Sequence, residues 1–207
     1  MEDCGQTVRA RRLDRLMSCV VSVIFGAFFA FGSIAAPAQD VNFKFDPQHT
    51  AINFTLGDVL HTVHGTFLLE RGSLTLDPLT AKLSGEIVVN ARSGQSGNGM
   101  RDRKMQKEVL ESDRYSEIAF RPDHLEGTLA LQGKSSVQVH GAFSIHGAEH
   151  ELSAPAEVEI FPDGWRATMR FEVPYAKWGM KNPSTLFLKV SESVDIDLSA
   201  AGTLTRP

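Results

Sequence analysis

Residues 136–147 read SVQVHGAFSIHG, and apolar side chains alternate there with polar ones. The apolar set is Val137, Val139, Phe143 and Ile145. Because successive side chains of a β-strand point to opposite faces of the sheet, this set would lie on one face and the polar residues on the other. The stretch therefore predicts a strand with one face against a core and one face in water.

The same alternation recurs through most of the chain after residue 40, with Gly, Pro and Asp positions between the repeats. Many short strands separated in this way are typical of an antiparallel sandwich or barrel. About eight of them in one domain would close into a barrel whose apolar lumen is filled by side chains or holds one small ligand. The other alternating stretches are residues 52–56, 62–77, 82–91, 167–175 and 194–204.

Breaks in the pattern predict turns and a helix. Residues 70–72 (ERG) are expected to divide the 62–77 stretch into two strands, and Asp77 with Pro78 predicts a turn after the second one. Residues 96–115 lose the alternation and place apolar side chains near helical spacing among basic residues. We expect a short helix there, packed across one end of the barrel.

The first 38 residues have the order of a secretory signal peptide. Four arginines within residues 9–15 precede an uncharged apolar run, residues 17–34, and small side chains follow it. We expect cleavage between residues 35 and 40, which leaves residues 40–207 as an exported domain in the periplasm or outside the cell. A retained membrane anchor is the alternative, because the apolar run is about long enough to span a bilayer as a helix.

Composition restricts the chemistry of that domain. Both cysteines, Cys4 and Cys19, lie in the signal segment, so the domain has no thiol for a disulfide, a nucleophile or a metal. The chain has 21 Lys and Arg against 25 Asp and Glu, and it lacks the basic stripe of a nucleic-acid-binding protein. It also lacks GxSxG, GxGxxG and Walker sequences. We therefore expect no catalytic residues, no metal and no cofactor.

The histidines leave one alternative open. Residues 57–67 read GDVLHTVHGTF, with His61 and His64 three positions apart and His49 upstream. A metal-dependent or acid–base enzyme could use these three side chains, since a catalytic zinc needs three protein ligands. No HExxH sequence supports such a site. We interpret the stretch as a strand end, a turn at the barrel rim and the start of the next strand.

Several segments, in this order, resemble the YceI family of exported, lipocalin-like proteins associated with polyisoprenoid and other lipid ligands. The family opens with Asp, two residues, His and Ser or Thr before an alternating strand, and residues 46–54 are similar; its His and Gly-x-Phe stand at residues 61–67. The resemblance covers residues 41–204 and implies an antiparallel, lipocalin-like β-barrel of about eight strands with one short helix. Further similar stretches are residues 91–102, 112–120 and 140–152.

Two departures from the family pattern lie near the expected barrel mouth. Lys104 stands where the family often has a histidine after its Arg-Asp pair, and Ser116 replaces a usual proline. These changes bear on the identity of the ligand rather than on the fold.

These observations predict a binding or carrier protein for an elongated apolar molecule, such as a polyisoprenoid or a fatty-acyl lipid, held in the lumen. The protein would not be an enzyme and would bind no nucleic acid. It would meet a membrane only transiently, for export or ligand exchange, and a homodimer is left open. Two alternatives remain: a histidine-dependent metal-binding protein or hydrolase, and a stress-response protein whose barrel is filled by its own side chains.

The predicted ligand site has an apolar and a polar part. We expect a polar head group to meet Arg101, Asp102, His61 and His64 at the mouth, where Arg101 and Asp102 carry over from the family's Arg-Asp pair. A structural ion pair that anchors the helix is the alternative role for those two residues. The apolar channel is expected to be lined by Phe54, Phe67, Val89, Phe120, Val139, Phe143, Phe171 and Trp178.

Overall fold

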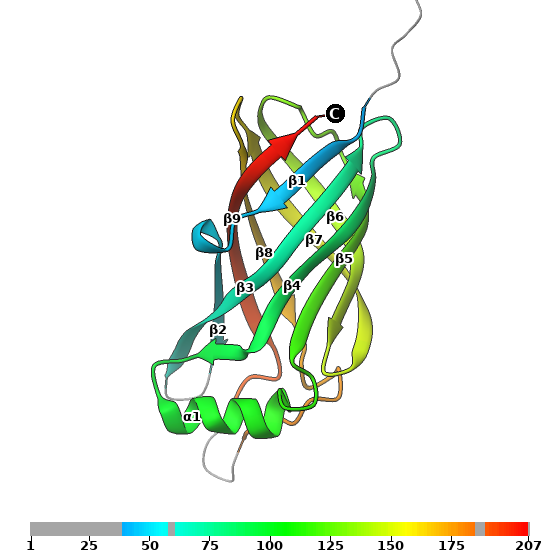
Figure 1. Cartoon of the computed structure of the whole chain (residues 1–207). Coiled ribbons are helices and arrows are strands. Elements are labelled where there is room, and N and C mark those ends of the chain that lie inside the picture. Colours follow the sequence, from blue (N-terminus) through cyan, green and yellow to red (C-terminus); the bar gives the residue numbers. More distant parts are fainter. Residues whose placement is uncertain (1–38, 58–60, 185–188, 207) are drawn as a thin grey trace, which may run out of the picture. The chain divides into compact units, whose positions relative to one another are not determined.

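Long antiparallel strands make up most of the part of the chain that the computed structural model describes, residues 39–57, 61–184 and 189–206 (Figure 1). The predicted signal peptide, residues 1–38, lies outside the described residues. The elements in chain order are β1 (Val41–Phe45), η1 (Pro47–His49), β2 (Ala51–Gly57), β3 (Thr62–Asp77), β4 (Lys82–Gln95), α1 (Gly99–Lys104), η2 (Met105–Val109), β5 (Glu117–Glu126), β6 (Gly133–Ile145), β7 (Ala148–Ile160), β8 (Trp165–Val173) and β9 (Val194–Thr205). Of the helical segments, η1 is a 3₁₀ turn, and α1 continues directly into η2, a turn of π-helix.

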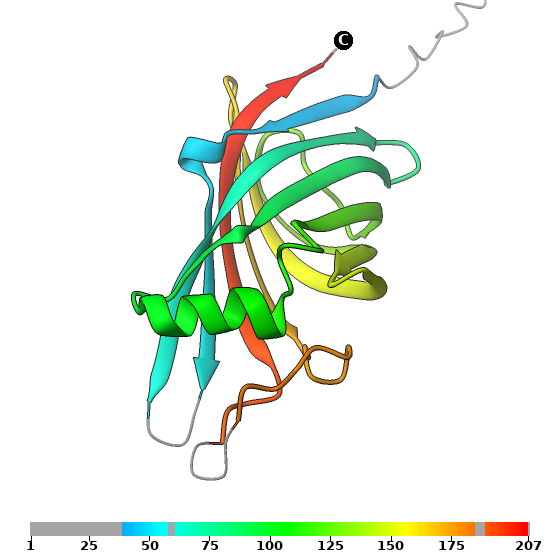
Figure 2. The same ribbon diagram turned by 60° about the horizontal axis from the view of Figure 1, so that its bottom comes forward.

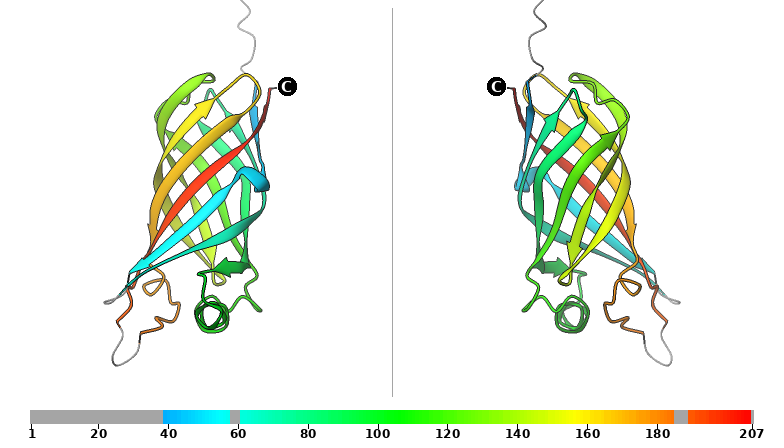
Figure 3. Two further views of the ribbon diagram at one scale, coloured as in Figure 1. Left: turned by 90° about the vertical axis from the view of Figure 1, so that its left-hand side faces the viewer. Right: turned by 90° about the vertical axis from the view of Figure 1, so that its right-hand side faces the viewer.

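The strands close into a barrel with eight strand positions (Figure 3). From β2 the hydrogen-bonded order runs through β9, β8, β7, β6, β5, β4 and β3, and β3 pairs with both β4 and β2. β1 pairs with the same two neighbours as β2, namely β3 and β9, but at their other ends. β1 and β2 are therefore two halves of one interrupted position, and the predicted antiparallel barrel of about eight strands is confirmed.

Local hydrogen bonding at η1 interrupts that position. The side-chain carboxylate of Asp46 accepts a hydrogen bond from the N–H of Gln48 at 2.8 Å. The backbone carbonyl of Asp46 accepts another from Thr50 Oγ1, also at 2.8 Å. Pro47 has no N–H to offer to a strand ladder. His49 Nδ1 lies 2.7 Å from the second carboxylate oxygen, and the hydrogen bonds from His49 and Gln48 hold the pKa of Asp46 below its usual value.

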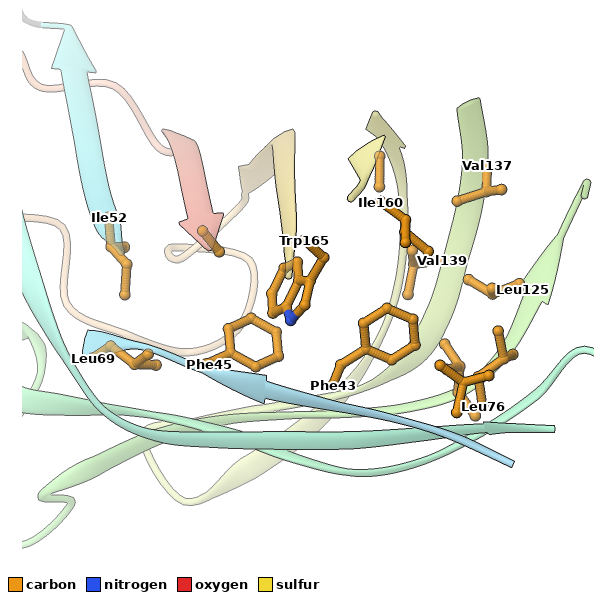
Figure 4. Packing of buried hydrophobic residues seen from close by; sticks show 14 residues of the cluster. Phe43, Phe45, Ile52, Leu69, Leu76, Leu125, Val137, Val139, Ile160 and Trp165 are labelled. Carbon is orange, nitrogen blue, oxygen red and sulfur yellow. The ribbon is translucent and has the colours of Figure 1, made fainter. Parts of the chain in front are cut away.

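Inward side chains fill the half of the barrel remote from α1, which we call the packed half (Figure 4). The ring of Trp165 meets the rings of Phe45 and Phe43 edge-on, with centroids 4.6 and 5.7 Å apart. The indole N–H donates to the carbonyl of Thr203 at 3.1 Å, so its polar group is satisfied. The alternation at residues 136–147 serves both halves. Val137 and Val139 are buried in the packed half, and Phe143 and Ile145 are buried in a second cluster near α1.

β3 is a single strand of 16 residues, so the turn expected at residues 70–72 is wrong. Gly72 stands there because Phe45 packs directly over it: a Cβ built on Gly72 would lie 2.7 Å from Phe45 Cγ. A strand glycine that makes room for a ring produces the same local sequence as a turn. The turn after Asp77 is confirmed, since its carboxylate accepts a hydrogen bond from the N–H of Leu79 at 2.9 Å.

The predicted helix is confirmed with shorter bounds, and it crosses the end of the barrel opposite the packed half (Figure 2). Asn98 caps α1, because its side-chain oxygen accepts hydrogen bonds from the N–H groups of Met100 and Arg101 at 3.0 and 3.2 Å. The π-helical turn closes with a bond from Leu110 N–H to the Met105 carbonyl at 2.9 Å. In the described part of the chain, no helix is both long and apolar enough to cross a bilayer.

We expect Phe45→Ala to lower the free energy of unfolding by about 3–5 kcal/mol, the usual cost of truncating a buried phenylalanine. The measurement is urea unfolding followed by circular dichroism. Lys44→Ala, at the exposed neighbouring position on β1, should change that free energy by less than about 0.5 kcal/mol.

Gly72→Ala should lower the free energy of unfolding when Phe45 is present, and the loss should be smaller in the Phe45→Ala background. Equal costs in both backgrounds would show that the ring and the glycine are not coupled.

Candidate functional site

A cavity of about 500 Å³ occupies the half of the barrel next to α1. Its wall is formed by the inward faces of all the strands from β2 to β9, and α1, η2 and the segment between β8 and β9 lie at its mouth. Its volume falls within the range of small-molecule sites, roughly 300–1,000 Å³. The aromatic side chains of the wall are Phe54, Phe67, Phe120, Phe143, Phe171 and Tyr175.

One glycine holds this aromatic wall in position. Gly65 pairs with Phe54 across β2 and β3, and a Cβ built on Gly65 would lie 2.2 Å from Phe54 Cζ. Phe54 in turn packs against Phe67, with ring centroids 5.4 Å apart. Any side chain at position 65 would displace the Phe54 ring, so the glycine of the HGTF stretch is required by the cavity wall.

Two segments cover the mouth, residues 99–109 (α1 and η2) and the described residues of 174–193, and we call them together the mouth cover. An ion pair joins them, with Lys181 Nζ 2.7 Å from Glu108 Oε2. Lys104 Nζ also donates to the carbonyl of Pro183 at 3.2 Å. The hydrogen bond from Lys181 is the main cause that lowers the pKa of Glu108, so this contact stays ionised under ordinary conditions.

Tyr175 anchors the second segment of the mouth cover. Its side chain is buried and lines the cavity, and its hydroxyl donates to the carbonyl of Ser191 at 2.5 Å. Burial, with a smaller contribution from the charge of Glu192, raises the pKa of Tyr175 to about 12. The residue is therefore a neutral hydrogen-bond donor at physiological pH.

Positive charge marks the mouth. Among the described residues that line the cavity, the charged side chains are Arg101 and Lys104, and none is acidic. Arg101 donates from Nε to Ser96 Oγ and from Nη2 to the Ser96 carbonyl, both at 2.7 Å. Asp102 accepts hydrogen bonds from the N–H of Ser96 at 2.8 Å and from its hydroxyl. Arg101 and Asp102 thus meet at Ser96, and together they fix the start of α1 to the end of β4.

Seven of the predicted site residues line this cavity. They are Phe54, Phe67, Val89, Phe120, Phe143, Phe171 and Arg101. Their placement agrees with the expected channel, and their part in ligand binding stays a prediction.

The other five predicted residues are not among the described lining residues of the cavity. Val139 belongs to the packed half, beside a smaller space of about 90 Å³. Trp178 stacks in parallel on His150, with ring centroids 4.1 Å apart. Asp102 bonds Ser96, and His61 and His64 are exposed near the start of β3.

The predicted site leaves out many lining residues, and three of them are informative about what the sequence could show. Lys104 lies three positions after Arg101, and that spacing on a helix places two side chains on neighbouring parts of one surface. This signal could have found it. Met180 comes from the irregular segment after β8, where no periodicity marks a buried side chain, whereas Tyr175 ends the alternating stretch 167–175 in phase with Phe171 and could have been found from it.

The structure does not bring the three histidines of the alternative site together. His49 belongs to η1, whereas His64 pairs with Thr55 on the far part of β2. Six residues of extended chain separate His49 from Thr55, which corresponds to about 20 Å. His49 bonds Asp46, and His64 Nδ1 lies 3.1 Å from Thr55 Oγ1. In the described ranges, no three His, Cys, Asp or Glu side chains are grouped so that they could hold a metal ion.

Comparison with known proteins gives one family and several similar folds. A family model described as the YceI-like domain matches residues 43–201. The crystal structure of BcnA from Burkholderia cenocepacia is 14% identical, with a TM-score of 0.63 over 77% of this chain and 99% of that chain. A polyisoprenoid binding domain from Saccharophagus degradans, implicated in plant cell wall breakdown, is 16% identical, with a TM-score of 0.62 over 79% and 98%. Among curated proteins no match is found.

We expect Tyr175 to titrate late. The chain has two tyrosines, so Tyr115→Phe leaves Tyr175 as the sole source of tyrosinate absorbance. Its midpoint should lie near pH 12 in the folded protein and near pH 10 in denaturant. Because the folded pKa is the higher one, the stability that neutral Tyr175 contributes is complete below about pH 10 and is lost as the pH rises through 12. A folded midpoint near 10 would show that the residue is not buried under the mouth cover.

Proposed function

The chain belongs to the YceI-like domain family, and on that premise we propose that it binds and carries an elongated apolar molecule in the barrel cavity. The proposed ligand classes are polyisoprenoids and fatty-acyl lipids. The observation that carries the proposal is the cavity itself, because inward apolar side chains from every strand between β2 and β9 form its wall.

The cavity wall favours an apolar ligand over water. Burial of apolar surface contributes about 25 cal/mol per Å². A buried water normally has roughly two to four polar partners, and the apolar wall offers few. Among the described lining residues, side chains with nitrogen or oxygen atoms are confined to Ser96, Arg101, Lys104 and Tyr175.

The ligand class has support from one similar structure. The Saccharophagus degradans domain is described as a polyisoprenoid binding domain, and it shares the barrel with this chain. Polyisoprenoids are therefore the first ligands to test. The proposal is one of binding without catalysis, and it sets aside the hydrolase alternative, whose three histidines do not meet.

The head group of the ligand would be anionic. Arg101 and Lys104 are at the mouth, and no acidic side chain accompanies them among the described lining residues. A phosphate or carboxylate placed between them gains charge-assisted hydrogen bonds, which are stronger than neutral ones. His61 and His64, exposed near the start of β3, remain candidates for a secondary contact with a larger head group.

We also propose that the barrel is exported and works in the periplasm or outside the cell. The order of basic, apolar and small residues in positions 1–38 supports this. Residue-level mapping of the N-terminus of the purified protein by mass spectrometry checks it. A mature protein that begins before residue 35 would contradict the predicted cleavage.

Extraction of the purified protein tests the binding proposal directly. The full chain is expressed, the protein is purified without detergent, and the organic extract is examined by mass spectrometry. We expect an isoprenoid or fatty-acyl lipid to be recovered reproducibly with the folded protein. Absence of lipid, together with no uptake of added polyprenyl phosphates or fatty acids, would overturn the proposal.

Lys104→Gln should separate the charge of the mouth from its packing. Glutamine retains a donor for the Pro183 carbonyl but removes the charge, so affinity for farnesyl phosphate should fall about tenfold while affinity for farnesol is unchanged. The measurement is calorimetric titration of both ligands. Lys107→Gln, at an exposed position on the same helix, should leave both affinities unaltered. Equal losses for farnesol and farnesyl phosphate would mean that Lys104 does not contact the head group.

A further inference from the structure

One side of the helical part of the mouth cover begins at the edge of the cavity and carries exposed side chains. Met100, Arg103 and Lys107 follow at positions i, i+3 and i+7, which places them on one side of a helix. All three side chains are exposed. Arg103 and Lys107 do not line the cavity, whereas Met100 lies at its edge, since it is among the lining residues and yet is 73% exposed. This side of α1 and η2 therefore presents an apolar side chain next to two cations.

The second segment of the mouth cover extends this surface. Lys177 and Lys189 are exposed there, and Figure 2 shows this segment, in orange, at the same end of the barrel as α1. Within the described residues, Arg103, Lys107, Lys177 and Lys189 make no ion pair. We call these four side chains with Met100 the basic rim.

The charge of this end is opposite to that of the chain as a whole. Residues 99–109 and 174–193 carry seven Lys and Arg against three Asp and Glu, whereas the whole chain has a net charge of -4. Two of the three acidic side chains are already engaged, Glu108 with Lys181 and Asp102 with Ser96, and the third is Glu192. Such an asymmetry orients a protein with its basic end toward a negatively charged surface.

We propose that the basic rim docks on an anionic lipid bilayer and holds the mouth of the cavity against the membrane. Lys and Arg side chains are attracted to anionic head groups, and Met100 would enter the interface between head groups and acyl chains. A bilayer fits better than an acidic protein or a nucleic acid, because the cations surround the mouth of an apolar cavity. A lipid passing between bilayer and cavity at this contact would avoid exposure to water. The choice of partner rests on the proposed function, but docking can be measured without any ligand in the cavity.

Vesicle cosedimentation tests the docking. The full chain is expressed, and the purified protein is mixed with vesicles of phosphatidylcholine alone or of phosphatidylcholine with phosphatidylglycerol. We expect binding to the anionic vesicles that weakens with added salt, as for contacts between exposed charges. The triple variant Arg103→Gln, Lys107→Gln and Lys177→Gln should bind them at least about tenfold more weakly. Met100→Ser should weaken binding without altering its salt dependence.

The matched control carries the same change of charge at other parts of the barrel. Lys44→Gln, Lys82→Gln and Lys134→Gln alter exposed lysines on β1, β4 and β6, away from the mouth cover, and should leave vesicle binding as it is. Equal weakening by both triple variants would overturn the proposal, and so would equal binding to both kinds of vesicle. An apolar segment retained at the N-terminus would bind both kinds alike, and the triple variant at the rim would not reduce that binding.

Ligand uptake in the absence of vesicles keeps the two proposals apart. The rim variant should take up a fluorescent fatty acid as the unaltered protein does, because Arg103, Lys107 and Lys177 are not among the residues that line the cavity. If uptake persists and the unaltered protein does not bind anionic vesicles, docking alone is wrong. If anionic vesicles are bound and no ligand is taken up, the proposed function is wrong and docking stands.

Discussion

The contact of Phe45 with Gly72 and Trp165 decides how the barrel can be used. An eight-stranded barrel has an interior just wide enough for side chains to fill or for one small ligand to occupy. This contact and the buried side chains around it fill one half, so that half is core. The remaining half contains the cavity of about 500 Å³, whose mouth lies beside α1. The same fold therefore provides stability at one end and a binding site at the other. The alternative of a barrel filled by its own side chains describes only the packed half.

The two halves also differ in what closes them. The packed half is closed by apolar contacts, which are costly to open because every exposed ring returns to water. The two segments of the mouth cover are joined by the ion pair of Lys181 with Glu108 and by the hydrogen bond from Lys104 to the Pro183 carbonyl. Both contacts are between partly exposed groups. Exposed ion pairs contribute little to stability. The mouth cover also contributes the buried side chains of Tyr175 and Met180 to the apolar cluster beside the cavity, so opening it would expose apolar surface as well as break these polar contacts.

One short helical segment serves three functions at this mouth. Asp102 and Arg101 attach it to Ser96 at the end of β4. Arg101 and Lys104 give the cavity its charged lining, and the basic rim on the outer side gives the proposed contact with a membrane. These roles can coexist because neighbouring positions of a helix point in different directions. A substitution on one side can therefore change head-group binding, docking or the attachment of the helix separately.

The sequence alone determined the class of fold and identified five phenylalanines of the cavity wall. Alternation with period two identifies inward positions wherever the strand is regular, so Phe54, Phe67, Phe120, Phe143 and Phe171 could be named in advance. The alternation did not determine which inward residues become core and which face a cavity. Val139 is an example, because it alternates as the five phenylalanines do but lies in the packed half. That division depends on contacts between residues distant in sequence, such as the packing of Phe45 over Gly72. The same contact explains why a glycine stands within β3, where the sequence predicted a turn. Only the tertiary structure decided the place of Met180 and Trp178, because they lie in a segment without periodic structure. It also separated His49 from His64 by most of the length of β2. Local pattern fixes the direction of a side chain, whereas burial depends on which distant segments pack against it.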